Sequence, residues 1–402
     1  MPIQKLAIEQ FLELAQQYPV LDVRSPGEFS HAHIPGAYSL PLFNDEERKV
    51  VGTTYKQQSR AAAIKIGLDY FGVKMKGMVE EAEKIVGGWK LEVSKDQRTG
   101  SNLQIPTSNI LVHCWRGGMR SSAVAWLLDL YGFKVYLLSG GYKAYRKWVL
   151  AQFEKEYNFT IIGGYTGSGK TPVLHELQKQ GKNIIDLEAL ANHKGSAFGA
   201  LGEKPQPGQE MFENLLSQSL HDTGYWILDK TVQDQALSKE LAGSNLQSVA
   251  TSELHPVSSI QYPVSTIFIE DESQRIGNLQ IPMPLWYTMR KSLVYFLDIP
   301  FNERLDHITE EYGKFEKEKL VNAIIRIQKR LGGLETKNAI NCLLENKHRD
   351  CFRILLGYYD KWYLKGLENR ENLASLLNKI PCAGVDTKSN TQKLLTCNLV
   401  ST

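Results

Sequence analysis

An eight-residue segment at 164–171 has the sequence G-Y-T-G-S-G-K-T and follows directly on an apolar run at 159–162. The run predicts a buried strand, and a helical pattern follows the segment. In this setting G-x-x-x-x-G-K-T predicts a loop whose backbone N–H groups surround a phosphate, with a lysine charge and a threonine that can hold Mg²⁺. We assign to this phosphate site Gly164, Gly167, Ser168, Gly169, Lys170 and Thr171. The chain should therefore contain an α/β domain that binds a di- or triphosphate, and the pattern does not require a nucleotide.

Acidic residues follow another predicted strand of this domain. The apolar run at 266–269 leads into Glu270 and Asp271, as in strands that position magnesium in phosphate-loop proteins. We expect Glu270 and Asp271 to support the phosphate site, with a magnesium ion at Thr171 and Asp271. An ordinary polar strand end is the alternative. A polar, glycine-bearing segment at 192–199 could close over the same ligand or form a surface loop.

The other chemical feature is a cysteine between a strand and a helix. An apolar run at 110–112 leads into H-C-W-R-G-G-M-R-S at 113–121, and a helical pattern follows at 122–130. Backbone N–H groups turned inward at the glycines, the helix dipole and the charges of Arg116 and Arg120 all favour a thiolate. We expect Cys114 to be a nucleophile of low pKa and take Cys114, Arg116 and Arg120 as catalytic residues. The alternative is a buried, inert cysteine.

The composition narrows the class of protein further. The 402 residues suggest two or three domains, and 42% hydrophobic with 23% charged residues is an ordinary globular balance. A net charge of +3 does not by itself indicate a nucleic-acid partner, which would need a local basic patch. The five cysteines form no C-x-x-C pair, so we expect neither zinc nor disulfides. With no signal-peptide core and no apolar run long enough to span a bilayer, the sequence predicts a soluble cytoplasmic protein.

Changes of pattern divide the chain into four parts. Residues 1–150 and 151–300 both predict strands alternating with helices, with a connecting helix at 142–157. Residues 221–262 are too long and too loosely patterned for an ordinary connection, so we treat them as an insertion. Strong helical periodicity at 301–380 predicts a helical region. The polar tail at 381–402 is expected to be disordered.

Basic and aromatic side chains occur together in the helical region. Arg326, Lys329 and Arg330 share one predicted helical face, and aromatic residues at 358–363 follow in a later helix. Basic groups with interleaved aromatics suit RNA, so these three residues are our candidates for RNA binding. Charged helical faces are more often simply solvated, and that alternative stays open.

Four motifs in the first 150 residues resemble the rhodanese family. They are L-D-V-R-S-P-G-E-F at 21–29, H-I-P-G-A at 33–37, the cysteine loop, and L-S-G-G-Y at 138–142. The resemblance implies an α/β domain with a parallel sheet, sulfur or selenium carried on Cys114, and scaffold roles for Asp22, Arg24 and His33. The C-x5-R spacing from Cys114 to Arg120 is one residue longer than in the commonest rhodanese loop, and it also resembles cysteine phosphatases. The loop alone leaves a chalcogen transferase and a phosphatase open.

The order of all these motifs resembles the bacterial tRNA 2-selenouridine synthase family over about residues 5–370. The resemblance implies a rhodanese-like domain, a P-loop α/β domain and a helical region, acting on the wobble 2-thiouridine of tRNA. Geranyl diphosphate would alkylate the sulfur, and selenium from selenophosphate would displace the geranylthio group. The phosphate loop would hold the diphosphate, and Cys114 would carry selenium. The alternatives are an NTP-dependent persulfide transferase that thiolates RNA, a cysteine phosphatase, and an RNA-binding adaptor.

Overall fold

The computed structural model describes residues 3–95, 109–223 and 266–400. Its contacts divide the chain into two compact units. The first unit consists of Met1–Gln152 and Gly208–Leu215, and the second consists of Phe153–Pro207 and Leu216–Thr402. The predicted phosphate-loop domain and helical region thus share one unit. The segment Gly208–Leu215, which we had placed in the phosphate-loop domain, belongs to the first unit.

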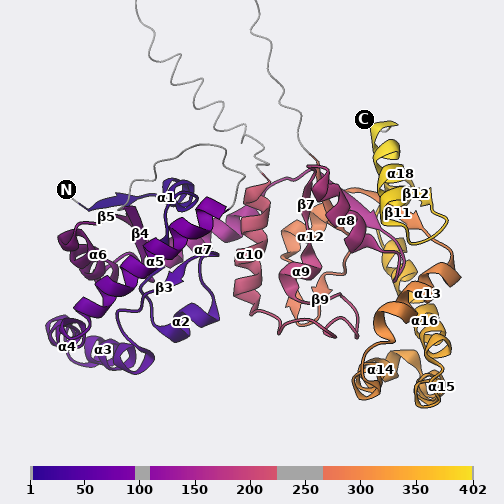
Figure 1. Cartoon of the computed structure of the whole chain (residues 1–402), viewed down its shortest axis with the longest axis horizontal. Coiled ribbons are helices and arrows are strands. Elements are labelled where there is room, and N and C mark those ends of the chain that lie inside the picture. The colour runs from indigo at the N-terminus through magenta and orange to yellow at the C-terminus, as the bar shows by residue number, and fades with distance from the viewer. Residues whose placement is uncertain (1–2, 96–108, 224–265, 401–402) are drawn as a thin grey trace, which may run out of the picture. The chain divides into compact units, whose positions relative to one another are not determined.

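A five-stranded parallel sheet forms the centre of the first unit, in the order β1-β5-β4-β2-β3 (Figure 1). The strands are β1 (Gln4–Leu6), β2 (Val20–Asp22), β3 (Tyr38–Ser39), β4 (Asn109–His113) and β5 (Lys134–Leu138). The helices are α1 (Ile8–Ala15), α2 (Pro26–His31), α3 (Asp45–Gln57), α4 (Arg60–Gly72), α5 (Met75–Lys95), α6 (Met119–Tyr131) and α7 (Gly141–Gln152), with the first part of α10 (Gln209–Asp222). Parallel strands need crossover connections, and these helices provide them.

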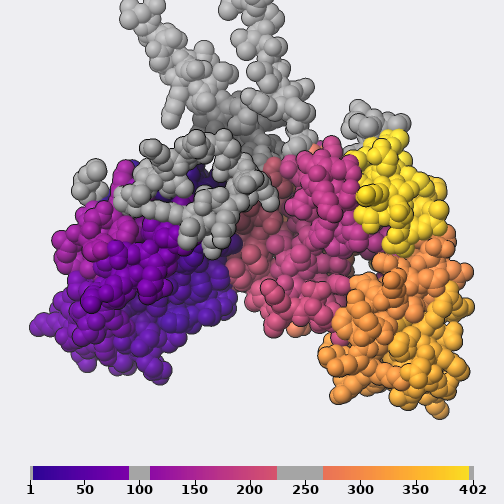
Figure 2. Space-filling model, in the orientation of Figure 1, coloured from indigo at the N-terminus to yellow at the C-terminus, as the bar shows by residue number. Residues whose placement is uncertain are grey.

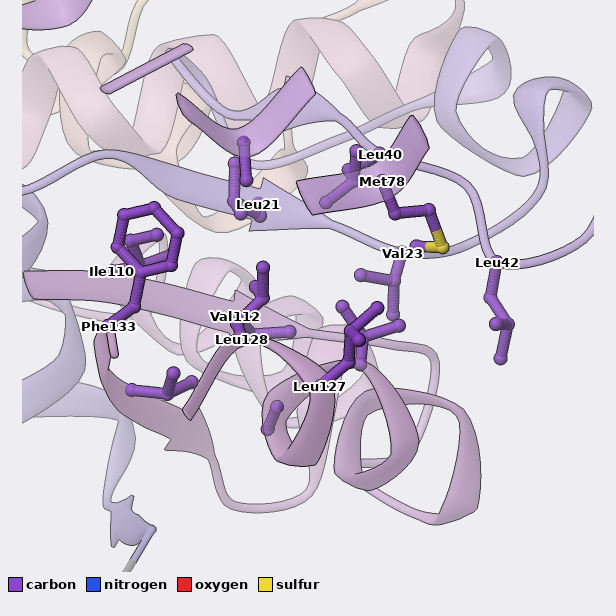
Figure 3. Close-up of a cluster of buried hydrophobic side chains, with 14 of the residues drawn as sticks. Leu21, Val23, Leu40, Leu42, Met78, Ile110, Val112, Leu127, Leu128 and Phe133 are labelled. Atoms are coloured by element: carbon purple, nitrogen blue, oxygen red, sulfur yellow. The ribbon is translucent and has the colours of Figure 1, made fainter. Parts of the chain in front are cut away.

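The core of the first unit joins the sheet to α5 and α6. Side chains of β2, β4, α5 and α6 form one buried cluster, which Figure 3 shows around Leu21, Ile110, Val112 and Leu128. Cys114 belongs to the same cluster. The apolar packing therefore fixes the start of the cysteine loop.

A second five-stranded parallel sheet forms the centre of the second unit, in the order β12-β11-β6-β8-β7. The strands are β6 (Phe159–Gly163), β7 (Asn183–Ile185), β8 (Ile267–Glu270), β11 (Leu293–Asp298) and β12 (Leu377–Pro381), and a small hairpin pairs β9 (Arg275–Ile276) with β10 (Leu279–Gln280). The helices near this sheet are α8 (Lys170–Lys179), α9 (Leu187–Ala191), the end of α10, and α12 (Met283–Lys291). Every residue of β6 is buried, because the strand is central in the sheet.

A helical region lies between β11 and β12 in the chain. Its helices are α13 (Phe301–Tyr312), α14 (Lys317–Leu331), α15 (Gly333–Leu344), α16 (His348–Glu368) and the short α17 (Leu373–Leu376). Apolar residues of α13 to α16 share a core that also contains Phe198 of segment 192–199. This core fixes the segment against the helical region.

The prediction of a disordered tail at 381–402 is wrong. The chain returns to the sheet as β12 and continues in α18 (Thr387–Val400), which packs beside α8 and contributes to the surface (Figures 1 and 2). Its buried face carries the polar residues Asn390 and Thr391 beside Leu394. Asn390 Nδ2 donates to the Gly384 carbonyl at 2.9 Å, and Thr391 Oγ1 donates to the Thr387 carbonyl at 2.7 Å. Because these bonds satisfy the buried polar groups, the helix packs without a clear apolar stripe. The sequence therefore lacked the apolar periodicity by which we predict helices.

The predicted insertion at 221–262 lies almost wholly outside the described residues. Only its start is described, where α10 continues to Asp222. Within the described ranges, no helix is long and apolar enough to cross a membrane.

Candidate active site

The cysteine loop connects β4 to α6. Cys114 follows β4 directly, and α6 begins at Met119. Gly117 has a φ of +63°, and a Cβ atom there would lie 2.6 Å from the Leu138 carbonyl oxygen. Only glycine fits this backbone, which supports the prediction of a sharp turn behind the cysteine.

The L-S-G-G-Y motif at 138–142 packs against the backbone of the cysteine loop. The Tyr142 N–H donates to the Cys114 carbonyl at 2.8 Å, and the Lys143 N–H donates to the Trp115 carbonyl at 3.0 Å. A Cβ atom on Gly141 would lie 2.3 Å from the Cys114 carbonyl oxygen. The second glycine of the motif is therefore required by the cysteine loop as well as by its own turn.

The environment of Cys114 favours a thiolate. The side chain is 3% exposed, and Sγ lies 3.2 Å from the Ser121 Oγ. Burial raises the pKa of Cys114, but the Ser121 hydroxyl and the backbone N–H groups of Arg116, Ser121 and Gly118 lower it by more. The pKa of this thiol therefore lies below its usual value, as we predicted.

The two arginines of the loop have different surroundings. The Arg116 side chain is exposed, and its backbone N–H is the group that acts on the thiol. Arg120 Nη1 donates to Glu28 Oε2 at 2.8 Å, and Arg48 Nε lies 2.9 Å from the same oxygen. Burial alone would raise the pKa of Glu28, but the Arg120 hydrogen bond and charge lower it to about 2. Arg120 is therefore paired with a carboxylate, an arrangement that does not favour a cysteine phosphatase, in which the arginine grips phosphate.

The scaffold residues suggested by the rhodanese motifs lie beneath the loop. Arg24 Nη2 donates to Asp22 Oδ2 at 2.5 Å and to the Ala32 carbonyl at 2.7 Å, and both charged residues are buried. His33 Nδ1 lies 2.9 Å from the Phe29 carbonyl oxygen. These bonds fix the chain around α2.

The phosphate loop connects β6 to α8 in the second unit. Gly164, Gly167 and Gly169 have φ values of +152°, +81° and +68°, which L-residues with side chains rarely adopt. Lys170 begins α8, and its Nζ donates to the Gly164 carbonyl at 3.2 Å. Ser168 is buried and donates to the Tyr165 carbonyl. The predicted residues are thus brought together in a strand–loop–helix arrangement of the kind that binds phosphate.

The helical region also contacts the phosphate loop, which we did not predict. Arg304 of α13 donates to the Thr166 carbonyl at 3.1 Å and forms two hydrogen bonds, of 2.9 and 2.8 Å, with Asp360 of α16. The Gly164 N–H donates to the Tyr363 hydroxyl at 3.1 Å. Arg304 lies on the buried face of α13 with Leu305 and Ile308. A charge on an otherwise apolar face was the available signal in the sequence.

The two predicted supporting acids have separate roles. Asp271 is engaged by Arg370 and accepts a 2.6 Å hydrogen bond from the Tyr363 hydroxyl, so its carboxylate is already paired. Glu270 is fully buried, and neither of its carboxyl oxygens has a hydrogen-bond partner among the described residues. Burial, followed by the charge of Glu188, raises the pKa of Glu270 well above its usual value. The prediction of a magnesium ligand at Asp271 is therefore not supported by its contacts.

Two further acids, Glu188 and Glu272, interact with Glu270, and the first of them contacts Thr171. Thr171 Oγ1 donates to Glu188 Oε2 at 3.0 Å. Burial, followed by the charge of Glu188, raises the pKa of Glu272 to about 8. The described residues include no set of three or more His, Cys, Asp and Glu side chains that would hold a metal alone. Mg²⁺ at a phosphate site takes only one or two carboxylates and is completed by phosphate oxygens and water, so Thr171, Glu188 and Glu270 fit it.

The three RNA-binding candidates lie on α14 in different surroundings. Arg326 Nη1 donates to the Ala197 carbonyl at 3.4 Å, so this side chain contacts segment 192–199. The Arg330 guanidinium lies 5.5 Å from the ring centre of Trp362, which is 44% exposed. Lys329 lines an open hollow of about 600 Å³ together with Lys337. All three side chains are exposed, and we retain Lys329 and Arg330 as the RNA-binding candidates because Arg326 contacts the Ala197 carbonyl.

The fold and the two loops define a class of protein: a rhodanese-like domain followed by a phosphate-loop α/β domain with a helical region. Residues 7–66 match the family model of the rhodanese-like domain. Residues 157–229 and 256–379 match that of the tRNA 2-selenouridine synthase AAA domain.

Known proteins agree with these two matches. The tRNA 2-selenouridine synthase of Bdellovibrio bacteriovorus is 31% identical, over 92% of this chain and 94% of that protein. That of Hydrogenovibrio crunogenus is 32% identical, over 86% of this chain and 88% of that protein. That of Nitrosomonas europaea is 33% identical, over 73% of this chain and 63% of that protein. The chain belongs to the tRNA 2-selenouridine synthase family.

Proposed function

We propose that this protein is a transferase that converts wobble 2-thiouridine of tRNA to 2-selenouridine through an S-geranyl intermediate. The observation that carries the proposal is the presence in one chain of an activated cysteine loop and a separate phosphate loop, in a member of this family. The first loop suits chalcogen chemistry, and the second suits a diphosphate. The co-substrates are geranyl diphosphate and selenophosphate.

The phosphate loop serves the alkylation step. The thiouridine sulfur attacks C1 of geranyl diphosphate, a C–S bond forms, the C–O bond breaks, diphosphate leaves, and the base loses its N3 proton. Negative charge grows on the leaving diphosphate, where Lys170 and the loop N–H groups stabilise it. Alkylation matters because the sulfur of 2-thiouridine is a poor leaving group, whereas the geranylthio group formed from it is a better one.

The residues beside the phosphate loop could also hold a magnesium ion, which would support the same step. Thr171, Glu188 and Glu270 would hold the ion beside the loop, and it would neutralise charge on the diphosphate. An unpartnered, buried carboxyl group such as Glu270 is costly without a cation, which supports this assignment. Asp271 positions Tyr363 and Arg370 instead.

Cys114 serves the selenium step. In that step the C2–S bond breaks, a C2–Se bond forms, and geranylthiol and phosphate are released as water is consumed. Selenium in selenophosphate is already at the selenide level, so the net exchange needs no oxidant or reductant. The lowered pKa of Cys114 supports its role as the nucleophile of this step. Its thiolate attacks the phosphorus of selenophosphate, the P–Se bond breaks, the released selenide displaces the geranylthio group, and water then cleaves the S–P bond to free phosphate and the thiolate. Arg116 and Arg120 shape the loop.

The helical region is proposed to bind tRNA. Lys329 and Arg330 supply charge for the phosphates, and the exposed ring of Trp362 supplies a surface for stacking. Arg326 supports segment 192–199 and contributes less.

The function is tested with the purified full-length chain and a thiolated tRNA. The protein is incubated with geranyl diphosphate and Mg²⁺, then with selenophosphate, and the digested nucleosides are identified by mass spectrometry. We expect S-geranyl-2-thiouridine first and 2-selenouridine after the second addition. A parallel reaction with unthiolated tRNA, ATP and a persulfide donor tests the rival NTP-dependent transferase. Thiolation there, without any geranylated product in the first reaction, would contradict the proposal.

A further inference from the structure

A small apolar cavity adjoins the phosphate loop within the second unit. It is lined by one residue of the loop, two of segment 192–199 and six of α13 and α16: Thr166, Ser196, Phe198, Ile308, Tyr312, Phe352, Leu355, Leu356 and Tyr359. Thr166 belongs to both the phosphate loop and the cavity wall. The cavity therefore shares a wall residue with the loop that would hold a diphosphate.

The chemistry of the lining indicates the kind of group that would enter. Ile308, Leu355 and Leu356 are aliphatic and buried, and two phenylalanine rings complete most of the wall. Two hydroxyl groups of the lining are already used: the Ala197 N–H donates to the Tyr359 hydroxyl at 3.1 Å, and the Phe198 N–H donates to the Ser196 Oγ at 3.2 Å. A ribose or a nucleobase would lose its hydrogen bonds to water here, whereas a hydrocarbon chain loses none.

We propose that this cavity receives the hydrocarbon chain of a prenyl diphosphate whose diphosphate lies in the phosphate loop. The assignment rests on the proposed function and specifies where the donor is recognised. The cavity encloses about 30 Å³, which is the room of roughly one water molecule. A geranyl chain is larger, so it enters by displacing a side chain of the wall.

Phe198 is the side chain of the wall that we expect the prenyl chain to displace. It belongs to segment 192–199, its ring lies 6.0 Å from that of Tyr312, and it is buried in the core of the helical region. Gly195 on its N-terminal side has a φ of +66°, and Gly199 follows it. The segment therefore carries glycines on both sides of the ring that the chain would replace, which lets the backbone adjust.

Substitutions at Leu355 test the cavity by changing its size in both directions. Leu355→Ala enlarges it, and Leu355→Phe fills it. Leu343→Ala and Leu343→Phe are matched controls, because Leu343 is buried in the same core but does not line the cavity. Binding of inorganic, dimethylallyl, geranyl and farnesyl diphosphates, and of ADP, to the full chain with Mg²⁺ is measured by calorimetry.

We expect the wild-type protein to bind geranyl diphosphate more tightly than inorganic diphosphate or ADP. Leu355→Ala should shift the preference toward the longer farnesyl donor by about tenfold, since burial of about two further methylene groups is worth that much. Leu355→Phe should shift it toward dimethylallyl diphosphate, and inorganic diphosphate, which does not reach the cavity, should bind all folded variants alike.

The outcomes separate this inference from the proposed function. If the prenyl chain adds affinity but the Leu355 variants behave like the Leu343 controls, the cavity does not bind the prenyl chain. The proposal that a prenyl diphosphate is the donor would still be supported. If geranyl diphosphate binds the wild-type protein no better than inorganic diphosphate, the donor is wrong and the cavity assignment falls with it.

Discussion

The cysteine loop and the phosphate loop are built on the same local plan but are supported differently. Each follows a buried parallel strand and enters a helix, and the backbone turns at one glycine with positive φ in the cysteine loop and at three in the phosphate loop. At the cysteine loop, a hydroxyl and backbone N–H groups act on the thiol, while Arg120 is paired with Glu28. At the phosphate loop, side chains from distant helices contact the backbone, and Glu188, which contacts Thr171, interacts with the buried acid Glu270. The groups that lower the pKa of the thiol in the first loop lie within seven residues of Cys114, whereas the backbone of the second loop is contacted by residues 138 and 199 positions further along the chain.

The largest effect should come from breaking the support of the phosphate loop. Asp360→Ala leaves the buried guanidinium of Arg304 without its counter-ion, which should lower the free energy of unfolding by about 3–5 kcal/mol. Denaturant unfolding of the full chain measures it. Asp306→Ala, which removes the exposed ion pair with Arg349, is the control and should change little. Equal losses in both variants would remove Arg304 as a support of the loop.

The acids beside Thr171 should make the stability of the second unit depend on pH. Burial and the charge of Glu188 raise the pKa of Glu272 to about 8, above its unfolded value of about 4.5. The folded state then holds a proton that the unfolded state has released, so this group lowers stability as pH rises from about 4.5 to about 8. The melting temperature of Glu272→Gln should exceed that of the wild type by a margin that grows over this range. A margin independent of pH would contradict the acid cluster.

The sequence predicted those structural features that depend on residues close together in the chain. Both loops, their strands and the lowered pKa of Cys114 follow from short motifs. Contacts such as Tyr363 with Gly164 join residues far apart in the sequence, so no spacing revealed them. Asp271 looked like a metal ligand because it follows a strand, yet Arg370 engages it after the chain returns from α16. The tertiary contact with Arg370 thus pairs Asp271 and leaves Glu270 without a partner among the described residues.

The exposed cations of α14 contrast with the paired arginine of the cysteine loop. Replacing Lys329 and Arg330 by Glu should weaken tRNA binding about tenfold at moderate salt and flatten its dependence on salt concentration. Lys317→Glu with Lys319→Glu, near the start of the same helix, gives the same change of charge as a control. Binding is measured by filter retention at several salt concentrations. A salt slope unchanged from wild type would exclude this face from the RNA surface.

The smallest effect should come from the hydroxyl beside the thiol. Ser121→Ala removes a hydrogen bond that lowers the pKa of Cys114, so less thiolate is present at neutral pH. Alkylation of Cys114 by iodoacetamide should slow by about threefold to tenfold, because one pKa unit is a tenfold change in thiolate. Ser122→Ala is the neighbouring control. A rate equal to that of wild type would leave the backbone N–H groups as the whole cause.

The division of labour between the loops is the central claim, and one chromatographic assay tests it. Thiolated tRNA is treated with geranyl diphosphate and then with selenophosphate, and its nucleosides are separated. Lys170→Ala should lose geranylation by about a hundredfold or more, because the leaving diphosphate loses its main charge partner. Cys114→Ser should still geranylate and should accumulate S-geranyl-2-thiouridine without forming 2-selenouridine. Loss of geranylation in a folded Cys114→Ser protein, or its formation of 2-selenouridine at the wild-type rate, would contradict the account.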